Sequence, residues 1–231
     1  MALSANWLKS INTTQPPQRK RKREDDSNAK KKAFKPIKTK ARVTAQAAVS
    51  VQVLTEPTIE PAGKPTRFLA MDCEMVGVGD EGTRSALARC TIVNFAGQVI
   101  YDKYVRPVED VTDYRTSVSG IEPHHIALDN PNAVDFKECQ AVVGALIKDR
   151  VLIGHSIGND LQALLLPHPK HLIRDTAHYK PLCPHRPKAL RVLAEQTLGV
   201  IIQQASHDSV EDARTVLAIY KTCKIEWEVT V

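Results

Sequence analysis

The sequence predicts an α/β fold with a mixed β-sheet flanked by helices over residues 67–231, preceded by a disordered basic tail at 1–66. Three strand-like apolar runs come first and are followed by alternating helical and strand patterns, which favours a mixed sheet. The charge is also divided. The tail holds 14 Lys and Arg against 5 Asp and Glu, a net +9, whereas the remainder holds 18 against 21, a net −3. The expected domain is therefore slightly acidic, which suits a domain that reserves carboxylates for cations.

The tail is rich in Lys, Pro, Thr, Gln and Ala and lacks sustained periodicity, as disordered segments do. Its basic clusters at 19–23 and 30–32 indicate a nuclear-import signal that an import receptor recognises, or a nucleic-acid contact. The alternative is a solvated tail without a targeting signal. No run reaches the roughly 18 apolar residues of a membrane span, and no apolar signal core begins the chain. The five cysteines are widely spaced. We expect a soluble, monomeric, intracellular protein with unpaired thiols and no membrane contact.

The elements follow from local patterns. Apolar runs predict strands at 67–76, 86–95, 98–105, 151–155 and 172–173, the second and third joined by a turn at Ala96 and Gly97. A loop is expected through Gly120. Helical patterns are expected at 130–148, 159–166, 190–198 and 209–226. Asn130 and Pro131 suit the first positions of the first helix, and Gly199 closes the third.

Two carboxylates interrupt the first apolar strand. Asp72 and Glu74 stand two residues apart, so strand alternation points both side chains to the same face. Two anions held in apolar surroundings repel each other and lose solvation, and a hard divalent cation offsets that cost. An exposed acidic pair is the alternative that this motif leaves open by itself.

Two further acidic positions follow strand ends or helix starts. Asp160 falls in the first turn of the helix after residues 151–155, where a favourable helix dipole is an equally good reason for an aspartate. Asp208 has the position of an N-cap, which makes His207 and Asp212 face each other across the helix start. A surface hydrogen bond between His207 and Asp212 is the alternative.

Together, Asp72, Glu74, Asp160, Asp212 and His207 make a set suited to two-metal phosphodiester hydrolysis. Two cations, Mg²⁺ or Mn²⁺, would stabilise the attacking and leaving oxygens, and the histidine would take the proton of the attacking water. Two other patterns carry less weight. Residues 77–82 match GxGxxG but precede a strand, so we interpret them as a turn. The histidines between 168 and 185 lack paired zinc-ligand spacing, and we interpret Asp175 as structural.

These motifs resemble those of the DEDDh exonucleases of the RNase H-like superfamily. The resemblance covers about residues 67–226, with motifs at 71–77, 154–164 and 207–214, and a histidine five residues before the last aspartate, as in the "h" branch. The stretches 101–107 and 112–121 resemble the group of RNA exonuclease 4 and the interferon-stimulated exonucleases. Residues 173–176 and 179–181, with the basic tail, favour the RNA exonuclease 4 side of that group.

By this resemblance, Asp72, Glu74, Asp160 and Asp212 correspond to metal ligands and His207 to the general base. Met75 and Arg115 fall at positions that touch the terminal nucleotide. From the residues alone, Met75 suits a core position, and Arg115 suits either substrate oxygens or a loop-fixing ion pair with Asp113 or Glu122. The chain departs from the pattern at Asp208, and our hypothesis is that this extra acid raises the pKa of His207.

The resemblance implies a metal-dependent 3′→5′ exoribonuclease that releases nucleoside 5′-monophosphates, in ribosomal RNA processing in the nucleus or nucleolus. RNA is the expected partner. A DNA exonuclease with the same site is one alternative, because phosphate-binding motifs do not decide the sugar. A nuclear nucleic-acid-binding or transcription-linked protein is another, although no base-reading motif is recognisable in the sequence.

Overall fold

The computed structural model describes residues 63–231, and the basic clusters at 19–23 and 30–32 lie outside the described residues. A seven-stranded mixed sheet forms the centre, in the order β5-β3-β2-β1-β6-β7, with β4 paired to β1. The strands are β1 (Phe68–Val78), β2 (Arg84–Asn94), β3 (Val99–Arg106), β4 (Val111–Asp113), β5 (Ala133–Asp135), β6 (Val151–Gly154) and β7 (Ile173–Asp175). The α/β class with a mixed sheet and flanking helices is confirmed.

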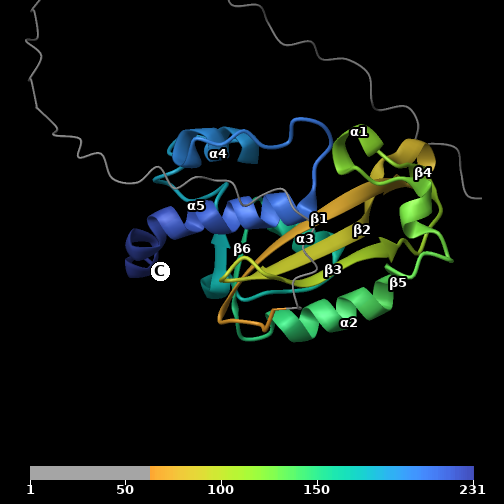
Figure 1. Ribbon diagram of the computed structural model, residues 1–231, viewed down its shortest axis with the longest axis horizontal. Coiled ribbons are helices and arrows are strands. Elements are labelled where there is room, and N and C mark those ends of the chain that lie inside the picture. The colour runs from red at the N-terminus through yellow and green to blue at the C-terminus, as the bar shows by residue number, and fades with distance from the viewer. Residues whose placement is uncertain (1–62) are drawn as a thin grey trace, which may run out of the picture. The chain divides into compact units, whose positions relative to one another are not determined.

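The helices cover both faces of this sheet (Figure 1). They are α1 (Thr116–Ser119), α2 (Phe136–Ile147), α3 (Gly158–Ala163), α4 (Leu190–Leu198) and α5 (Ser209–Val229). One core cluster joins β1 and β2 to α2 and α3, and a second joins the opposite face to α4 and α5. In the described part of the chain, no helix has both the length and the apolarity that a membrane crossing requires.

Strands β1, β2 and β3 form an antiparallel meander, whereas β6 is parallel to β1 and β5 is parallel to β3. The turn between β2 and β3 lies where it was expected, with Gly97 at φ 85°. The glycine-rich segment ends β1 and enters a short 3₁₀ turn, Asp80–Gly82, before β2, so its interpretation as a turn is confirmed. All five cysteines are free thiols.

The helix expected to begin at Asn130 begins six residues later. Residues 133–135 form β5 instead, which pairs in parallel with the end of β3. The Asn130 side chain closes a loop, since its amide donates to the His125 carbonyl at 2.6 Å and its Oδ1 accepts from the Asn132 backbone at 2.9 Å. The prediction was wrong because burial of Val134 on the sheet overrode a local capping signal.

Two more elements were not expected. Strand β4 and helix α1 lie in the stretch 107–120 that was interpreted as a loop. Both are short, three and four residues, so neither carries a periodic signal. At the N-terminal end of the described range, residues 63–66 hydrogen-bond to the strands beside the β2–β3 turn. Gly63 donates to the Val99 carbonyl, and the Lys64 carbonyl accepts from the Asn94 side chain.

Candidate active site

The acidic pair on β1 lies on the sheet face that α5 covers. Ala70, on the same face, packs in the core against α5, and Asp72 and Glu74 continue this alternation toward the end of the strand. Asp72 is partly exposed and Glu74 is buried. The buried Glu74 Oε1 atom has no hydrogen-bond partner among residues 63–231. The register between β1 and β2 shifts directly after this pair, because Glu74 pairs with Arg89 and Met75 with Leu87, which leaves one residue of β2 as a bulge.

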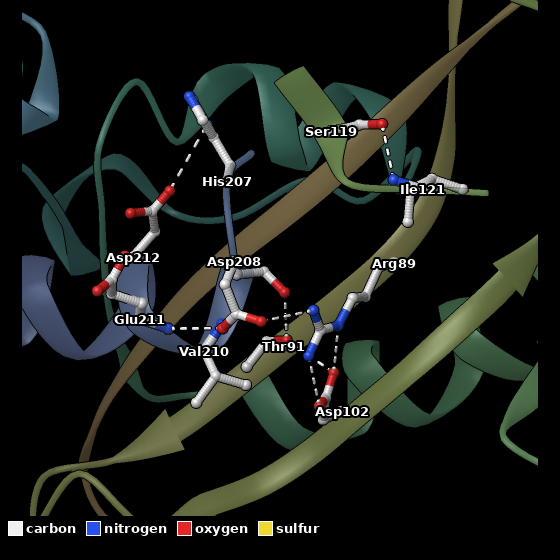
Figure 2. A network of polar contacts seen from close by, with 11 residues as sticks. Arg89, Thr91, Asp102, Ser119, Ile121, His207, Asp208, Val210, Glu211 and Asp212 are labelled. Carbon is white, nitrogen blue, oxygen red and sulfur yellow. Dashed lines mark hydrogen bonds and ion pairs between the residues drawn. The ribbon is translucent and has the colours of Figure 1, made fainter. Parts of the chain in front are cut away.

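The start of α5 supplies the histidine. Asp208 is the N-cap, as predicted, and its Oδ1 accepts from the backbone N–H groups of Val210 and Glu211 at 3.0 Å each. His207 and Asp212 then face each other, with 3.6 Å between Nδ1 and Oδ2 (Figure 2). The predicted relation across the helix start is therefore present.

Asp212 is almost fully buried, and Gln203 Nε2 donates to its Oδ2 at 2.8 Å. Its other oxygen, Oδ1, is buried, and no group in the described part of the chain hydrogen-bonds to it. Burial raises the pKa of Asp212 to about 6, although the Gln203 hydrogen bond opposes this shift. Gln203 has a positive φ of 55° and was not predicted as a site residue.

Asp160 reaches the same place from the first turn of α3. It is 5% exposed, and burial raises its pKa to about 7, while hydrogen bonds, including those from Cys73, lower it. Burial first, and then the charges of Asp160, Asp212 and Glu74, raise the pKa of Asp72 well above its ordinary value. The four carboxylates thus affect one another electrostatically.

The tightest group consists of Glu74, His207 and Asp212, whose ligand atoms lie within 4.8 Å of one another. Asp72 and Asp160 lie outside this group. Burial raises the pKa of Glu74 to about 8, and the Asp212 charge adds to the shift. Buried carboxylate oxygens without partners, beside other carboxylates, are what a divalent cation would satisfy, so the donor set fits a hard metal ion.

A pocket of ≈ 860 Å³ opens beside this cluster, and its lining includes Glu74, His207, Met75 and Arg115. Cys73, of the same strand, also lines it. Met75 is partly buried: it packs against the core and also lines the pocket. The structure therefore brings both predicted substrate-binding residues to one cavity with part of the carboxylate cluster.

Arg115 is held by the β1–β2 turn. Its guanidinium donates to Ser85 Oγ at 2.9 Å and to the Gly82 carbonyl at 2.7 Å. Among the described residues it forms no ion pair with Asp113 or Glu122, so the alternative of a loop-fixing ion pair is wrong. Asp113 instead accepts from the Arg115 backbone N–H, which helps hold that residue at φ 49°.

Further pocket residues had no sequence signal. Helix α1 contributes Val118 and Ser119, and α3 and the turn after it contribute Asn159, Gln162 and Leu165. The contribution of α1 depends on Gly120, which is at φ 66° and whose added Cβ would lie 3.0 Å from the His207 carbonyl. The His207 backbone N–H also donates to the Val118 carbonyl at 2.9 Å. Only a residue without a side chain permits this approach.

The sequence did not indicate a role for Arg89, which lies on β2 beside the start of α5. Arg89 on β2 donates two hydrogen bonds to Asp102 at 2.9 Å and one to Asp208 at 3.1 Å (Figure 2). Thr91 links the same Asp102 to Ser209, in the first turn of α5, through contacts of 2.9 and 2.7 Å. This network joins the sheet to the helix that carries His207.

The network overturns the hypothesis about Asp208. Its carboxylate is occupied by Arg89 and by the helix N–H groups, and burial lowers the pKa of His207 rather than raising it. The pKa of Asp208 itself is lowered: burial opposes the shift, and hydrogen bonds and the Arg89 charge outweigh it. Asp208 therefore acts as a cap and an ion-pair partner.

Asp175 has the structural position that its interpretation predicted. Its Oδ1 accepts from the backbone N–H groups of Ser156 and Ala177, at 2.8 and 3.0 Å, and its Oδ2 lies 3.0 Å from His178 Nδ1. It thus holds the loop between β6 and α3, which places the helix turn that carries Asp160.

Comparison with known proteins matches residues 69–220 to the RNase T family model, described as exonuclease. The chain belongs to this exonuclease family. The chain is 52% identical over 170 residues to RNA exonuclease 4 of Mycosarcoma maydis, covering 71% of this chain and 44% of that protein. It is 46% identical to the human RNA exonuclease 4, covering 80% and 43%, and 40% identical to that of Saccharomyces cerevisiae, covering 84% and 68%. The chain thus spans about half the length of several of these relatives.

Solved structures resemble the exonuclease domain as well. The Pan2 pseudoubiquitin hydrolase–RNA exonuclease module of Saccharomyces cerevisiae in complex with A7 RNA has a TM-score of 0.64 and 33% identity, covering 74% of this chain and 30% of that one. The Pan2 catalytic unit of Neurospora crassa has a TM-score of 0.61 and 28% identity, covering 76% and 29%. The comparisons confirm the predicted resemblance to exonucleases of this fold and to proteins named RNA exonuclease 4.

Proposed function

We propose that this exonuclease is a metal-dependent 3′→5′ exoribonuclease that releases nucleoside 5′-monophosphates. The observation that carries the proposal is the pair of partnerless buried oxygens on Glu74 and Asp212, beside His207 at the wall of a pocket. RNA as substrate is supported by the similarity to proteins named RNA exonuclease 4 and to an exonuclease module solved with RNA.

Asp72, Glu74, Asp160 and Asp212 would hold two divalent cations, Mg²⁺ or Mn²⁺. When bound, the cations would stabilise negative charge on the attacking and leaving oxygens. Removing any one of these carboxylates would leave the donor set incomplete. The raised pKa values of Glu74 and Asp160 have the same origin, because each carboxylate is buried near others without a cation to compensate them.

The histidine supplies the base. Burial lowers the pKa of His207, so its ring is neutral near pH 7 and able to accept a proton from the attacking water. Asp212 lies 3.6 Å from Nδ1, which orients the ring and favours the imidazolium once it forms. The hydrogen bond from the His207 backbone to Val118 fixes the segment that carries the ring.

The pocket supplies the substrate contacts. Hydrogen bonds hold both the backbone and the side chain of Arg115 in place. Its guanidinium is a forked donor suited to phosphate or sugar oxygens. Met75 offers an apolar, adaptable surface for the terminal base. These roles account for the two pocket residues that the sequence predicted to bind substrate.

The wider role extends the same proposal. We place the protein in the nucleus, with the nucleolus and ribosomal RNA processing as its setting, and with an import receptor recognising the basic clusters at 19–23 and 30–32. We further propose that it acts as a monomer. Localisation of a tagged protein, with and without alanine at both clusters, tests the first part; an unchanged nuclear signal would refute it.

The deciding experiment uses 5′-labelled single-stranded RNA and matched DNA with Mg²⁺. The wild type should shorten RNA from its 3′ end and release nucleoside 5′-monophosphates, whereas Asp72→Asn or a chelator should abolish this. Asp129→Asn, at an exposed loop position away from the pocket, is the matched control. Faster loss of DNA would favour the DNA exonuclease, and binding without shortening would favour a nucleic-acid-binding protein.

A further inference from the structure

Helix α3 ends in a Schellman motif. The Leu166 N–H donates to the Leu161 carbonyl at 3.0 Å, and the Leu165 N–H donates to the Gln162 carbonyl at 3.1 Å. Leu165, which follows the last residue of the helical turn, is in the left-handed conformation at φ 52°. Leu161 and Leu166 both pack in the core, which completes the apolar contact of this motif. The backbone at residue 165 is therefore fixed by its neighbours.

Leucine is a poor residue for this position. A Cβ crowds the backbone in the left-handed region, so glycine is usual there and asparagine is next. The same chain uses glycine after α1 and α4, where Gly120 and Gly199 have φ values of 66° and 69°. Among the positive-φ residues other than glycine in the described range, Leu165 is the only one with an apolar side chain.

Core packing does not compensate this strain. The Leu165 side chain is 69% exposed, whereas its neighbour Leu164 is fully buried. Gln140 Nε2 donates to the Leu164 carbonyl at 2.9 Å. This hydrogen bond holds the backbone of the turn and does not involve the Leu165 side chain. An exposed leucine at a strained position needs a reason outside the folded domain itself.

The pocket provides that reason. Leu165 lines the ≈ 860 Å³ cavity that also holds Glu74 and His207, and so does Val118, which is 56% exposed. The protein therefore presents two exposed aliphatic side chains in the wall of the pocket that holds Glu74 and His207. Such surfaces suit the faces of nucleobases, which are apolar whatever the base.

We propose that Leu165 is a substrate-binding residue that contacts a nucleobase of the RNA strand, without distinguishing one base from another. This inference rests on the proposed function. The residue would contribute to affinity and to positioning the strand, and it would take no part in proton transfer or in holding cations.

The test replaces Leu165 without disturbing the backbone. Leu165→Asn and Leu165→Gly both accept the left-handed conformation, and Leu165→Met keeps an apolar side chain. Leu128→Asn, at a leucine that is 90% exposed outside the pocket lining, is the matched control. Each variant is measured for KM and kcat on single-stranded RNA, for Tm, and for the Kd of RNA in an Asp72→Asn background.

We expect Leu165→Asn and Leu165→Gly to raise KM and Kd about tenfold with kcat within about twofold, since the lost contact is apolar burial shared by ground and transition states. Tm should not fall, and Leu165→Met and Leu128→Asn should match the wild type. Unchanged KM and Kd would overturn the inference, as would a large fall in Tm, which would make the residue structural. If the wild type degrades no RNA, the proposed function fails, while the Kd values still decide the contact.

Discussion

The Arg89 guanidinium donates to the Asp208 carboxylate at 3.1 Å and so joins β2 to the N-terminus of α5. Arg89 also stands directly opposite Glu74 in the antiparallel register, where its charge partly opposes the effect of burial on the Glu74 pKa. The Arg89 guanidinium thus interacts both with the carboxylate pair on β1, through its charge, and with the start of the helix beside His207, through a hydrogen bond. Two predictions concern the parts that it joins.

The first prediction concerns the cap. Asp208→Ala should lower the free energy of unfolding by about 1–2 kcal/mol, because two helix N–H groups lose their acceptor. Asp208→Ser keeps a capping oxygen and loses only the ion pair with Arg89, so it should cost less, below about 1 kcal/mol. Urea denaturation checks both, with Asp129→Ala as control. Equal losses in the two variants would show that the ion pair, and not the cap, carries the stability.

The second prediction concerns cation binding. The folded-state pKa of Glu74, about 8, lies above its ordinary value of 4.5, so protonation favours the folded state. The metal-free protein should therefore lose stability as pH rises from about 4.5 to 8. Glu74→Gln should remove the part of that loss that Glu74 contributes, on the order of 2 kcal/mol at pH 8 in chelator, while the other buried carboxylates keep theirs.

Cation addition completes this test. Mg²⁺ should raise the Tm of the wild type at pH 8, because it binds the folded state alone, and should have little effect on Glu74→Gln. Thermal melts at several pH values, with and without chelator, measure both effects. An equal Mg²⁺ response in the two proteins would contradict the assignment of Glu74 as a ligand.

The third prediction concerns Arg115 in the pocket wall. Arg115→Ala should raise KM for RNA about tenfold, because a held guanidinium fork is lost. Arg115→Lys should recover part of this, since a lysine provides one charge but not the fork. Arg186→Ala, at an exposed position outside the pocket lining, is the control. A fall in kcat with unchanged KM would place Arg115 in the chemical step instead.

The fourth prediction lies at the far end of α5. Arg174 is almost fully buried and donates to both oxygens of Glu228, at 2.6 and 2.9 Å, and Tyr220 donates to Glu228 as well. Glu228→Gln should therefore lower the free energy of unfolding at pH 7 by about 2 kcal/mol, leaving the guanidinium without its counter-charge.

The pH dependence checks the same pair. The Arg174 hydrogen bond lowers the pKa of Glu228, so the stabilisation is present above the ordinary pKa of 4.5 and is lost as pH falls through the lowered value. The difference between wild type and Glu228→Gln should thus shrink below about pH 4. Glu226→Gln, exposed on the same helix, should differ little from wild type at any pH. A constant difference would refute the ionic origin.

Local sequence patterns predicted the α/β class, the shared face of Asp72 and Glu74, and the cap at Asp208 that turns His207 toward Asp212. Each depends on contacts within a few residues, where backbone periodicity and capping chemistry decide the outcome. The same logic placed Asp160 in the first turn of a helix, and in the structure its charge raises the pKa of Asp72.

The features that these local patterns missed arise from contacts between distant parts of the chain. Val134 became a strand by pairing with β3, Arg89 met Asp208 from 119 residues away, and the strained turn at Leu165 turned an exposed leucine toward the pocket. Pairing partners, long-range ion pairs and pocket walls join segments that are distant in the chain. Their energies depend on burial and on the distances that the whole fold creates, which no local pattern contains.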